Sequence, residues 1–200
     1  MSYDREYTKV FHSPGIEPWI AGFLKSKQYK VALDLGCGLG FMSLILKLYL
    51  KNVEHLVGLD ISREKLIKAK GLNLYDDLLL ADARVPPFRN RTFDLVVSIE
   101  VLHGLPRHVL EELETLSRNS TVLTLPTLPK GVCVSYFAER GYRCYRYLLR
   151  GFIIVGLNDY KILLTSDSRF FKAARFFLYL LKPILKAVRF FERGYILAFR

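Results

Sequence analysis

VALDLGCGLG, the stretch from Val31 to Gly40, decides how this chain folds. The apolar run from Val31 to Leu35 is typical of a strand that is buried on both faces of a sheet. Three glycines follow at every second position, where the backbone must turn tightly and let a ligand lie against it. A helix is expected next, over about Phe41 to Tyr49, with its first N–H groups facing that ligand. The stretch therefore predicts a turn that binds a nucleotide-type cofactor.

Strands and helices alternate from this turn to residue 125. Further helices are expected over Arg63 to Lys70, capped by Ser62, and over His108 to Leu116. Further strands are expected over Leu56–Asp60, Leu78–Ala81, Phe93–Ile99 and Thr121–Leu125. This alternation predicts an α/β fold: a Rossmann-like, doubly wound, mostly parallel sheet with helices on both faces.

The pattern is less regular beyond Pro126. The expected elements there are a helix over Val132–Glu139, strands over Tyr142–Leu157 and Tyr160–Thr165 joined by a turn at Asn158-Asp159, a helical stretch over Arg169–Phe191 and a last strand over Tyr195–Phe199. We expect one domain over 1–200. Its expected parts are an N-terminal helical lid (1–30), a cofactor-binding core (31–125), and substrate-side elements with a basic helical tail (126–200).

Composition favours a folded protein in a reducing compartment. Hydrophobic residues make up 51% of the 200, which is enough for a substantial core. The polar start does not look like a secretory signal, and no uncharged apolar run is long enough for a transmembrane segment. Cys37, Cys133 and Cys144 are odd in number and lack CxxC spacing, so neither a disulfide framework nor a metal site is expected. We therefore expect a cytoplasmic protein.

The net charge of +11 is concentrated at the C-terminal end. Residues 168–200 hold eight basic side chains and one acidic side chain, so this segment carries +7 of the total. Within it, 169–193 reads as an amphipathic helix with one basic face, inserted before the last strand. Its apolar face is expected to cover the domain's own core or substrate pocket. Peripheral contact with an anionic membrane surface and a clamp on RNA are the alternatives.

The spacing of the glycines separates two cofactor classes. A dinucleotide turn has the pattern G-x-G-x-x-G, but Phe41 stands where the third glycine would be. The chain instead has D-x-G-x-G-x-G, which begins at Asp34. With VGLDIS, LLLADA and FDLVVSIEVLHGL, it resembles the four successive motifs of the class I S-adenosylmethionine-dependent methyltransferases, in the type 11 branch that includes the ubiquinone and menaquinone biosynthesis enzymes. A nicotinamide-dependent oxidoreductase remains the minor alternative.

The resemblance implies a seven-stranded sheet with an antiparallel last strand, S-adenosyl-L-methionine as cofactor, and a role for each matching residue. Asp34 would anchor the amino group of the cofactor, because a carboxylate suits an ammonium. Asp60 would accept from both ribose hydroxyls, Ile61 would pack on the adenine, and Asp82 would receive the adenine amino group. The remaining cofactor-binding residues would be Gly36, Cys37, Gly38, Gly40, Ala83, Ser98 and Ile99.

Two residues after the fourth strand are candidates for removing a proton from an acceptor. His103 in EVLHGLP can act as a base near neutral pH, and Glu100 is the second candidate. Methyl transfer from a sulfonium mainly requires alignment and exclusion of water, so no base is obligatory. For each of the two residues, a purely structural role is the alternative.

The acceptor is not identified by these motifs. A small or lipid-like apolar molecule is expected first, because the substrate side and the tail are rich in Phe, Tyr and Leu. RNA, in particular tRNA, is second because of the positive charge. His103-Gly104 stands where the tRNA wobble-uridine enzymes have two histidines. A catalytically silent cofactor-binding subunit that serves a partner is the third reading.

Overall fold

The computed structural model of the chain describes residues 20, 24, 27–49, 53–102, 105–125, 134–148, 153–156, 162–164 and 196–199. The elements in the first half are β1 (Val31–Leu35), α3 (Phe41–Tyr49), β2 (His55–Asp60), α4 (Arg63–Lys70), β3 (Asp77–Leu80), β4 (Phe93–Ile99), α5 (Arg107–Leu116) and β5 (Ser117–Leu125). The second half adds α6 (Val134–Glu139), β6 (Arg143–Leu148), β7 (Ile153–Gly156), β8 (Ile162–Leu164) and β9 (Ile196–Phe199).

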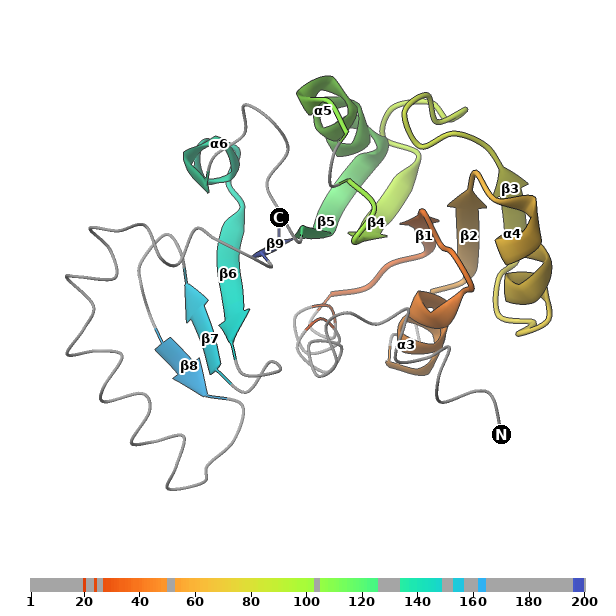
Figure 1. Cartoon of the computed structure of the whole chain (residues 1–200), viewed down its shortest axis with the longest axis horizontal. Helices are drawn as coiled ribbons and strands as arrows, with labels where there is room; N and C mark the ends of the chain where they lie inside the picture. The colour runs from red at the N-terminus through yellow and green to blue at the C-terminus, as the bar shows by residue number, and fades with distance from the viewer. Residues whose placement is uncertain are drawn as a thin grey trace.

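All strands form one sheet in the order β3-β2-β1-β4-β5-β9-β6-β7-β8 (Figure 1). The five strands from β3 to β5 pair in parallel, with β1 at the centre of this half. Chain order reverses across β1, because β2 and β3 extend to one side and β4 and β5 to the other. In open sheets of this kind, the carboxyl ends of the strands next to such a reversal are where ligands bind.

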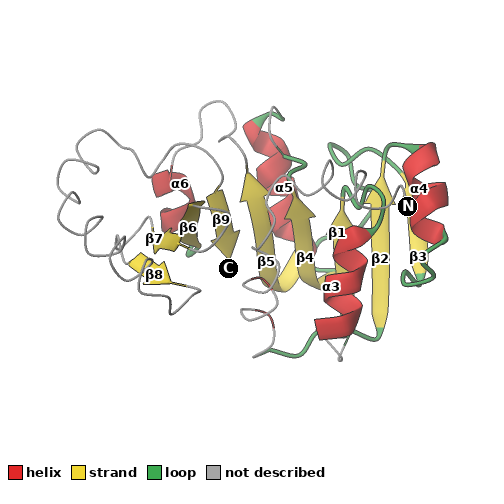
Figure 2. Ribbon diagram, turned by 60° about the horizontal axis from the view of Figure 1, so that its bottom comes forward, coloured by secondary structure: helices red, strands yellow, loops and turns green. Residues whose placement is uncertain are grey.

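Helices cover both faces of the parallel half, as the alternation predicts. Figure 1 shows α3 and α5 on opposite sides of the sheet, and Figure 2 shows α3 in front of it. Alternate residues of β1 point to opposite faces: Leu33 and Leu35 join the core cluster of α5, whereas Ala32 joins the cluster of α3. Asp34 shares the face of Ala32, so its carboxyl group points into the layer beneath α3.

Local signals placed most boundaries of this half correctly. The bounds of β1, β4, α3 and α4 match the expected ones, and the Ser62 hydroxyl caps α4 by accepting from the Lys65 N–H at 3.4 Å. Ile20 and Leu24 are helical and buried, as expected for the segment before β1. Strand β5 begins four residues earlier than expected, because Ser117 pairs with the start of β4 across a register shift.

In the part of the chain that the structure describes, the sheet has nine strands rather than the expected seven. The stretch expected as one strand from Tyr142 to Leu157 is two strands, β6 and β7, which pair antiparallel with Leu148 opposite Ile153. Arg150 and Gly151 stand between these two strands in the sequence, and glycine inside a strand pattern weakens a strand. Strand β9 is antiparallel to both β5 and β6, as expected for the last strand.

Several expectations concern residues outside those described. They include most of the N-terminal lid (1–30), the turn at Asn158-Asp159 and the amphipathic helix over 169–193. None of the helices in the described part of the chain combines the length and apolarity needed to cross a membrane.

Candidate functional site

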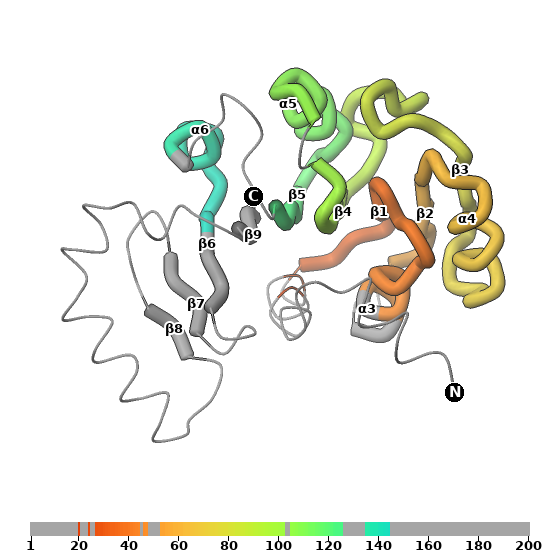
Figure 3. Tube along the Cα trace, in the orientation of Figure 1, coloured from red at the N-terminus to blue at the C-terminus, as the bar shows by residue number. Residues whose placement is uncertain are grey.

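The turn from β1 into α3 has a backbone shape that glycine allows. Gly36, Gly38 and Gly40 have φ of 77°, 55° and 86°, in the left-handed region that other residues rarely occupy. The N–H groups of Gly36 and Cys37 both donate to the Leu59 carbonyl, at 2.7 and 2.9 Å. Figure 3 follows the chain through this turn, where β1 passes into α3 beside the carboxyl end of β2. The turn is therefore fixed to the neighbouring strand before any ligand arrives.

Glycine at position 36 is required by space as well as by φ. A Cβ atom there would lie 2.2 Å from a methyl carbon of Val101, which follows the end of β4. At Gly38 the situation is the opposite, because a Cβ would meet no atom within 4 Å. The turn is thus packed tightly against β4 at its first glycine and borders open space at its second.

Asp60 closes the turn from the side of β2. Its side chain is 7% exposed, and each carboxylate oxygen accepts one backbone hydrogen bond at 2.8 Å, from the N–H groups of Gly38 and Ser62. Each oxygen has a second lone pair that can accept from a ligand hydroxyl. Asp60 is therefore oriented by its own backbone environment and placed beside the open space at Gly38.

Asp34 lies in β1, two residues before the first glycine of the turn, in a nearly dry environment. Its side chain is 2% exposed, and Oδ2 accepts a hydrogen bond of 2.6 Å from the hydroxyl of Tyr75. Burial raises the pKa of the Asp34 carboxyl to about 7; the Tyr75 hydrogen bond lowers this pKa and the charge of Asp60 raises it. This carboxyl group therefore changes its charge near neutral pH.

The loop after β3 places Asp82 next to an arginine. Both Asp82 oxygens accept from Arg84, with Nε at 2.8 and 3.0 Å and the terminal nitrogen at 2.5 Å, and the Arg84 N–H donates to Oδ1 at 2.8 Å. These hydrogen bonds lower the pKa of the Asp82 carboxyl. Ile61 is 67% exposed after the end of β2, and Ala83 is partly buried against the core. The exposed Ile61 suits an apolar contact with a flat ring.

The end of β4 forms the third side of the site. Ser98 is fully buried and its hydroxyl donates to the Leu35 carbonyl at 3.2 Å, so this hydroxyl holds β4 against the end of β1. Ile99 packs against the α3 cluster. Glu100 has φ of 60°, and its N–H donates to both the carbonyl and the hydroxyl of Thr124. A non-glycine residue in this conformation is strained, and such residues concentrate at functional sites.

The structure thus brings the expected cofactor residues together around one turn, at the carboxyl edge of the parallel strands. Their roles toward a bound cofactor stay predictions. His103 lies outside the described residues, next to the buried Leu102. Burial also raises the pKa of the Cys37 thiol, which makes this thiol a poor nucleophile.

Sequence reasoning missed the partners of two acids, Tyr75 for Asp34 and Arg84 for Asp82. A signal for Tyr75 was present, because Gly58 lies in the middle of β2 and glycine inside a strand often marks a close approach by another group. Arg84 offers no comparable signal, since arginine near aspartate is common on surfaces.

The residues present fit S-adenosylmethionine. The turn has the glycines and the open space, Asp60 offers two oriented oxygens for ribose hydroxyls, and Ile61 offers an exposed apolar side chain. Asp34 supplies a carboxyl group on the side expected for the amino group of the cofactor. The arrangement can hold an adenosyl group.

Replacing Asp60 by asparagine is expected to weaken binding of S-adenosylhomocysteine by about tenfold, because an amide keeps only one of the two acceptor oxygens. Isothermal titration calorimetry measures this affinity. Asp77→Asn is the matched control, because Asp77 is an exposed acid at the amino end of β3, paired with His55 at 2.8 Å. Equal affinities of the Asp60 and Asp77 variants would contradict the role of Asp60.

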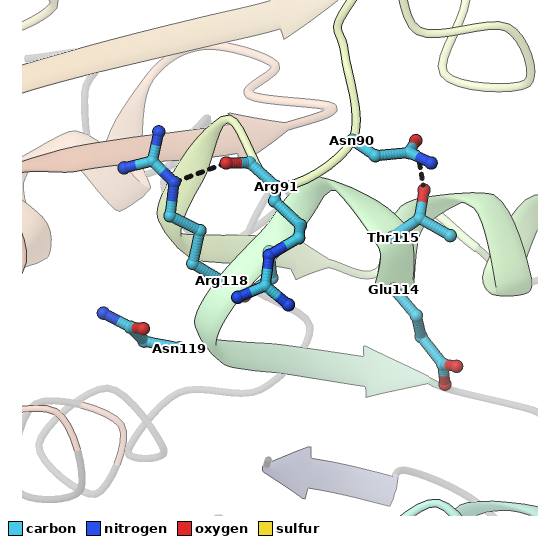
Figure 4. A pocket seen from close by; sticks show the side chains of 7 residues that line it. Asn90, Arg91, Glu114, Thr115, Arg118 and Asn119 are labelled. Atoms are coloured by element: carbon cyan, nitrogen blue, oxygen red, sulfur yellow. Dashed lines mark hydrogen bonds between the residues drawn. The ribbon is translucent and has the colours of Figure 1, made fainter.

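The described residues also line a hollow of about 490 Å³ at the opposite, amino edge of the sheet. It is lined by Asn90, Arg91, Glu114, Thr115, Ser117, Arg118 and Asn119 (Figure 4). Arg118 Nε donates to the Arg91 carbonyl, and Arg118 Nη1 lies 3.3 Å from Asp94 Oδ1. This hollow is separated from the glycine turn by the length of the strands and takes no part in the cofactor site.

Residues 33–124 match the family model described as a methyltransferase domain. The match begins in β1 and ends in β5, so it covers the parallel half of the sheet and the whole turn described above.

Three curated proteins are similar to the chain. A tRNA (carboxymethyluridine(34)-5-O)-methyltransferase of Saccharomyces cerevisiae is 31% identical over 54% of this chain and 41% of its own length. A demethylmenaquinone methyltransferase of Lactobacillus johnsonii is 29% identical over 76% of this chain and 66% of its own length. A human mitochondrial arginine-hydroxylase is 34% identical over 44% of this chain and 25% of its own length. The chain thus spans less than two thirds of each relative.

Solved structures share the fold at low identity. A protein of Pyrococcus horikoshii OT3 has a TM-score of 0.51 at 20% identity, over 79% of this chain and 74% of its own. The plantazolicin methyltransferase, solved with S-adenosylhomocysteine, has a TM-score of 0.51 at 21% identity, over 62% of this chain and 52% of its own.

Proposed function

We propose that the chain is a class I S-adenosylmethionine-dependent methyltransferase of type 11, and that it transfers the methyl group of this cofactor to an acceptor. The match of residues 33–124 to a methyltransferase-domain model supports this proposal. When bound, S-adenosylmethionine supplies a methyl group on a positively charged sulfonium.

The chain's own residues have three tasks in this reaction. Asp34 binds the ammonium group of the cofactor, and Asp60 binds its ribose hydroxyls. Gly36 lets the turn pack against Val101, and Gly38 leaves the backbone uncovered by any side chain where the ligand lies. Packing of β4 against β1, through Ser98, fixes the floor of the site, so that donor and acceptor can be held in line.

One observation carries this proposal above the others. The glycine turn has positive φ at all three glycines, and its second glycine donates to the buried carboxylate of Asp60, beside open space. This places an oriented acid against a backbone that no side chain covers.

The proposal is tested by following a labelled methyl group. The full chain would be incubated with methyl-labelled S-adenosylmethionine and a cell extract, then fractionated into lipid, RNA, protein and small molecules. We expect label in one fraction above the level given by Gly36→Ala, which removes the turn. Label in no fraction, with S-adenosylhomocysteine still bound, would contradict methyl transfer and favour a silent cofactor-binding subunit.

A small or lipid-like apolar acceptor is the first choice. The relative named a demethylmenaquinone methyltransferase aligns with 76% of this chain, and aromatic residues make up 14% of the sequence. An acceptor atom that must lose a proton would do so to Glu100 or His103. Glu100 follows β4 on the same edge as the turn, and its left-handed backbone is fixed by two bonds to Thr124.

A tRNA acceptor is the second candidate. The relative named a tRNA methyltransferase is 31% identical to this chain, whose net charge is +11. When a protein binds a phosphate backbone, the logarithm of its association constant falls linearly with the logarithm of the salt concentration. Filter binding with bulk tRNA, at low and at physiological salt, distinguishes the candidates. Tight binding that falls by about a hundredfold or more would favour RNA over the apolar acceptor.

A further inference from the structure

Tyr75 reaches into the site from a loop that the sequence motifs do not include. It precedes β3, and its hydroxyl donates to Asp34 Oδ2 at 2.6 Å. The two residues are 41 positions apart, so the bond connects the end of β1 to the loop after α4. Tyr75 packs against the core cluster on the α3 face, where Asp34 is 2% exposed.

The Tyr75 ring occupies a slot that two glycines leave open. A Cβ atom at Gly58, in β2, would lie 2.8 Å from the ring, and a Cβ atom at Gly40 would lie 3.0 Å from it. Gly58 pairs with Asp34 in the sheet register, so the ring lies against the strand next to the carboxyl group that it contacts. A side chain at position 58 would overlap both the ring and a methyl carbon of Leu78, which lies 2.7 Å from the same Cβ position.

The residue after Tyr75 fixes this loop from both sides. The Asp76 Oδ2 accepts from the Leu56 N–H at 2.6 Å and from Lys47 Nζ at 2.9 Å. The Asp76 N–H also donates to the Leu56 carbonyl at 2.9 Å. The loop is therefore tied to β2 and to α3, which leaves the Tyr75 ring little freedom to leave its slot.

We propose that Tyr75 is a positioning residue for cofactor binding: its hydroxyl orients the Asp34 carboxylate and favours its ionised form. This rests on the proposed function, in which ionised Asp34 binds the ammonium group of the cofactor. The titratable groups that act on the pKa of Asp34 are Tyr75 and Asp60, and the charge of Asp34 in turn helps to raise the pKa of the Cys37 thiol. A hydrogen bond to the charged form lowers a carboxyl pKa, so loss of the Tyr75 hydroxyl raises it further.

The test compares Tyr75→Phe with the wild-type chain across pH. Phenylalanine keeps the ring in its slot and removes only the hydroxyl. Wild-type affinity for S-adenosylhomocysteine is expected to rise with pH through about 7, as Asp34 ionises. Because the missing bond raises the Asp34 pKa, Tyr75→Phe is expected to bind roughly tenfold more weakly near pH 6 and less than about twofold more weakly near pH 8.5.

Tyr29→Phe is the matched control. Tyr29 is also buried, and its hydroxyl donates to Ser120 at 3.2 Å, away from the turn. This variant should bind S-adenosylhomocysteine as the wild-type chain does at every pH. An equal loss at all pH values in Tyr75→Phe, or no loss, would overturn the proposal, because a merely structural role does not change the pH profile.

A second measurement separates this inference from the proposed function. The carbon-13 shift of the Asp34 carboxyl, followed by NMR in the ligand-free chain, should titrate at a higher pH in Tyr75→Phe than in the wild-type chain. An unchanged midpoint would overturn the proposal even if the cofactor binds. If the Asp34 midpoint is higher in Tyr75→Phe but the wild-type chain binds no S-adenosylhomocysteine, the proposed function is overturned and the Tyr75–Asp34 coupling is upheld.

Discussion

Asp34→Asn is expected to make the folded chain more stable above neutral pH while it weakens cofactor binding. Burial raises the pKa of Asp34 from 3.8 to about 7. A carboxyl group whose pKa is higher in the folded state stabilises the fold fully below its unfolded pKa, and this stabilisation is lost as pH rises through the folded pKa. Above pH 7 the fold therefore holds a costly buried charge, which asparagine removes while its amide oxygen still accepts from Tyr75.

The gain in unfolding free energy above pH 7 is on the order of 3 kcal/mol, and it shrinks as the pH falls from about 7 to about 4. Urea unfolding at several pH values measures it. The same variant should bind S-adenosylhomocysteine about tenfold to a hundredfold more weakly above pH 7, since a charge-assisted hydrogen bond to the ammonium is lost.

Asp76→Asn is expected to change stability in the opposite direction to Asp34→Asn. Burial alone would raise the pKa of Asp76, but hydrogen bonds from the Leu56 N–H and Lys47 lower it overall. The ionised Asp76 carboxylate therefore stabilises the fold at neutral pH, and this stabilisation is lost as the pH falls through the lowered pKa. Asp76→Asn should reduce stability at neutral pH. If Asp34→Asn also did so, Asp34 would not be the costly buried acid described here.

Gly36→Ala is expected to abolish cofactor binding and to destabilise the fold. The added Cβ would lie 2.2 and 2.7 Å from two methyl carbons of Val101, and φ at this position is +77°. Valine is stiff about its first side-chain torsion, so these methyl groups cannot rotate away freely. Left-handed strain together with overpacking predicts a loss of about 3 kcal/mol in unfolding free energy. The turn must also move away from β4, so we expect at least a hundredfold loss of affinity for S-adenosylhomocysteine. This loss corresponds to a binding free energy of about 3 kcal/mol, similar to the loss in unfolding free energy.

Gly141→Ala is the control that separates backbone strain from steric overlap of the added Cβ. Gly141 has φ of +79°, but a Cβ there would meet no atom within 4 Å, and it lies after α6, away from the turn. It should lose about 1–2 kcal/mol through strain alone and bind S-adenosylhomocysteine normally. Adding Val101→Ala to Gly36→Ala should recover part of the lost stability, measured as a coupling in a double-mutant cycle. Losses at Gly36 no larger than those at Gly141 would contradict the steric argument.

The fold of the parallel half was predictable because its signals are local. The apolar run before Gly36, the cap at Ser62 and the alternation of elements each act within a few residues, and the observed bounds of β1, α3, α4 and β4 follow them. The antiparallel half was predicted less well. The stretch from Tyr142 to Leu157, with a glycine at position 151, is compatible with either one strand or two, and only pairing between β6, β7 and β9 decides.

The local pattern alone predicts the class of the site: a glycine turn after a buried strand, with acids at the ends of the next two strands. What each acid contacts depends on folding, because those partners are distant in sequence. Tyr75 lies 41 positions from Asp34, and Asp60 lies 22 positions from the N–H that it accepts. Burial of Asp34, and hence its charge near neutral pH, likewise arises from side chains that only folding brings together.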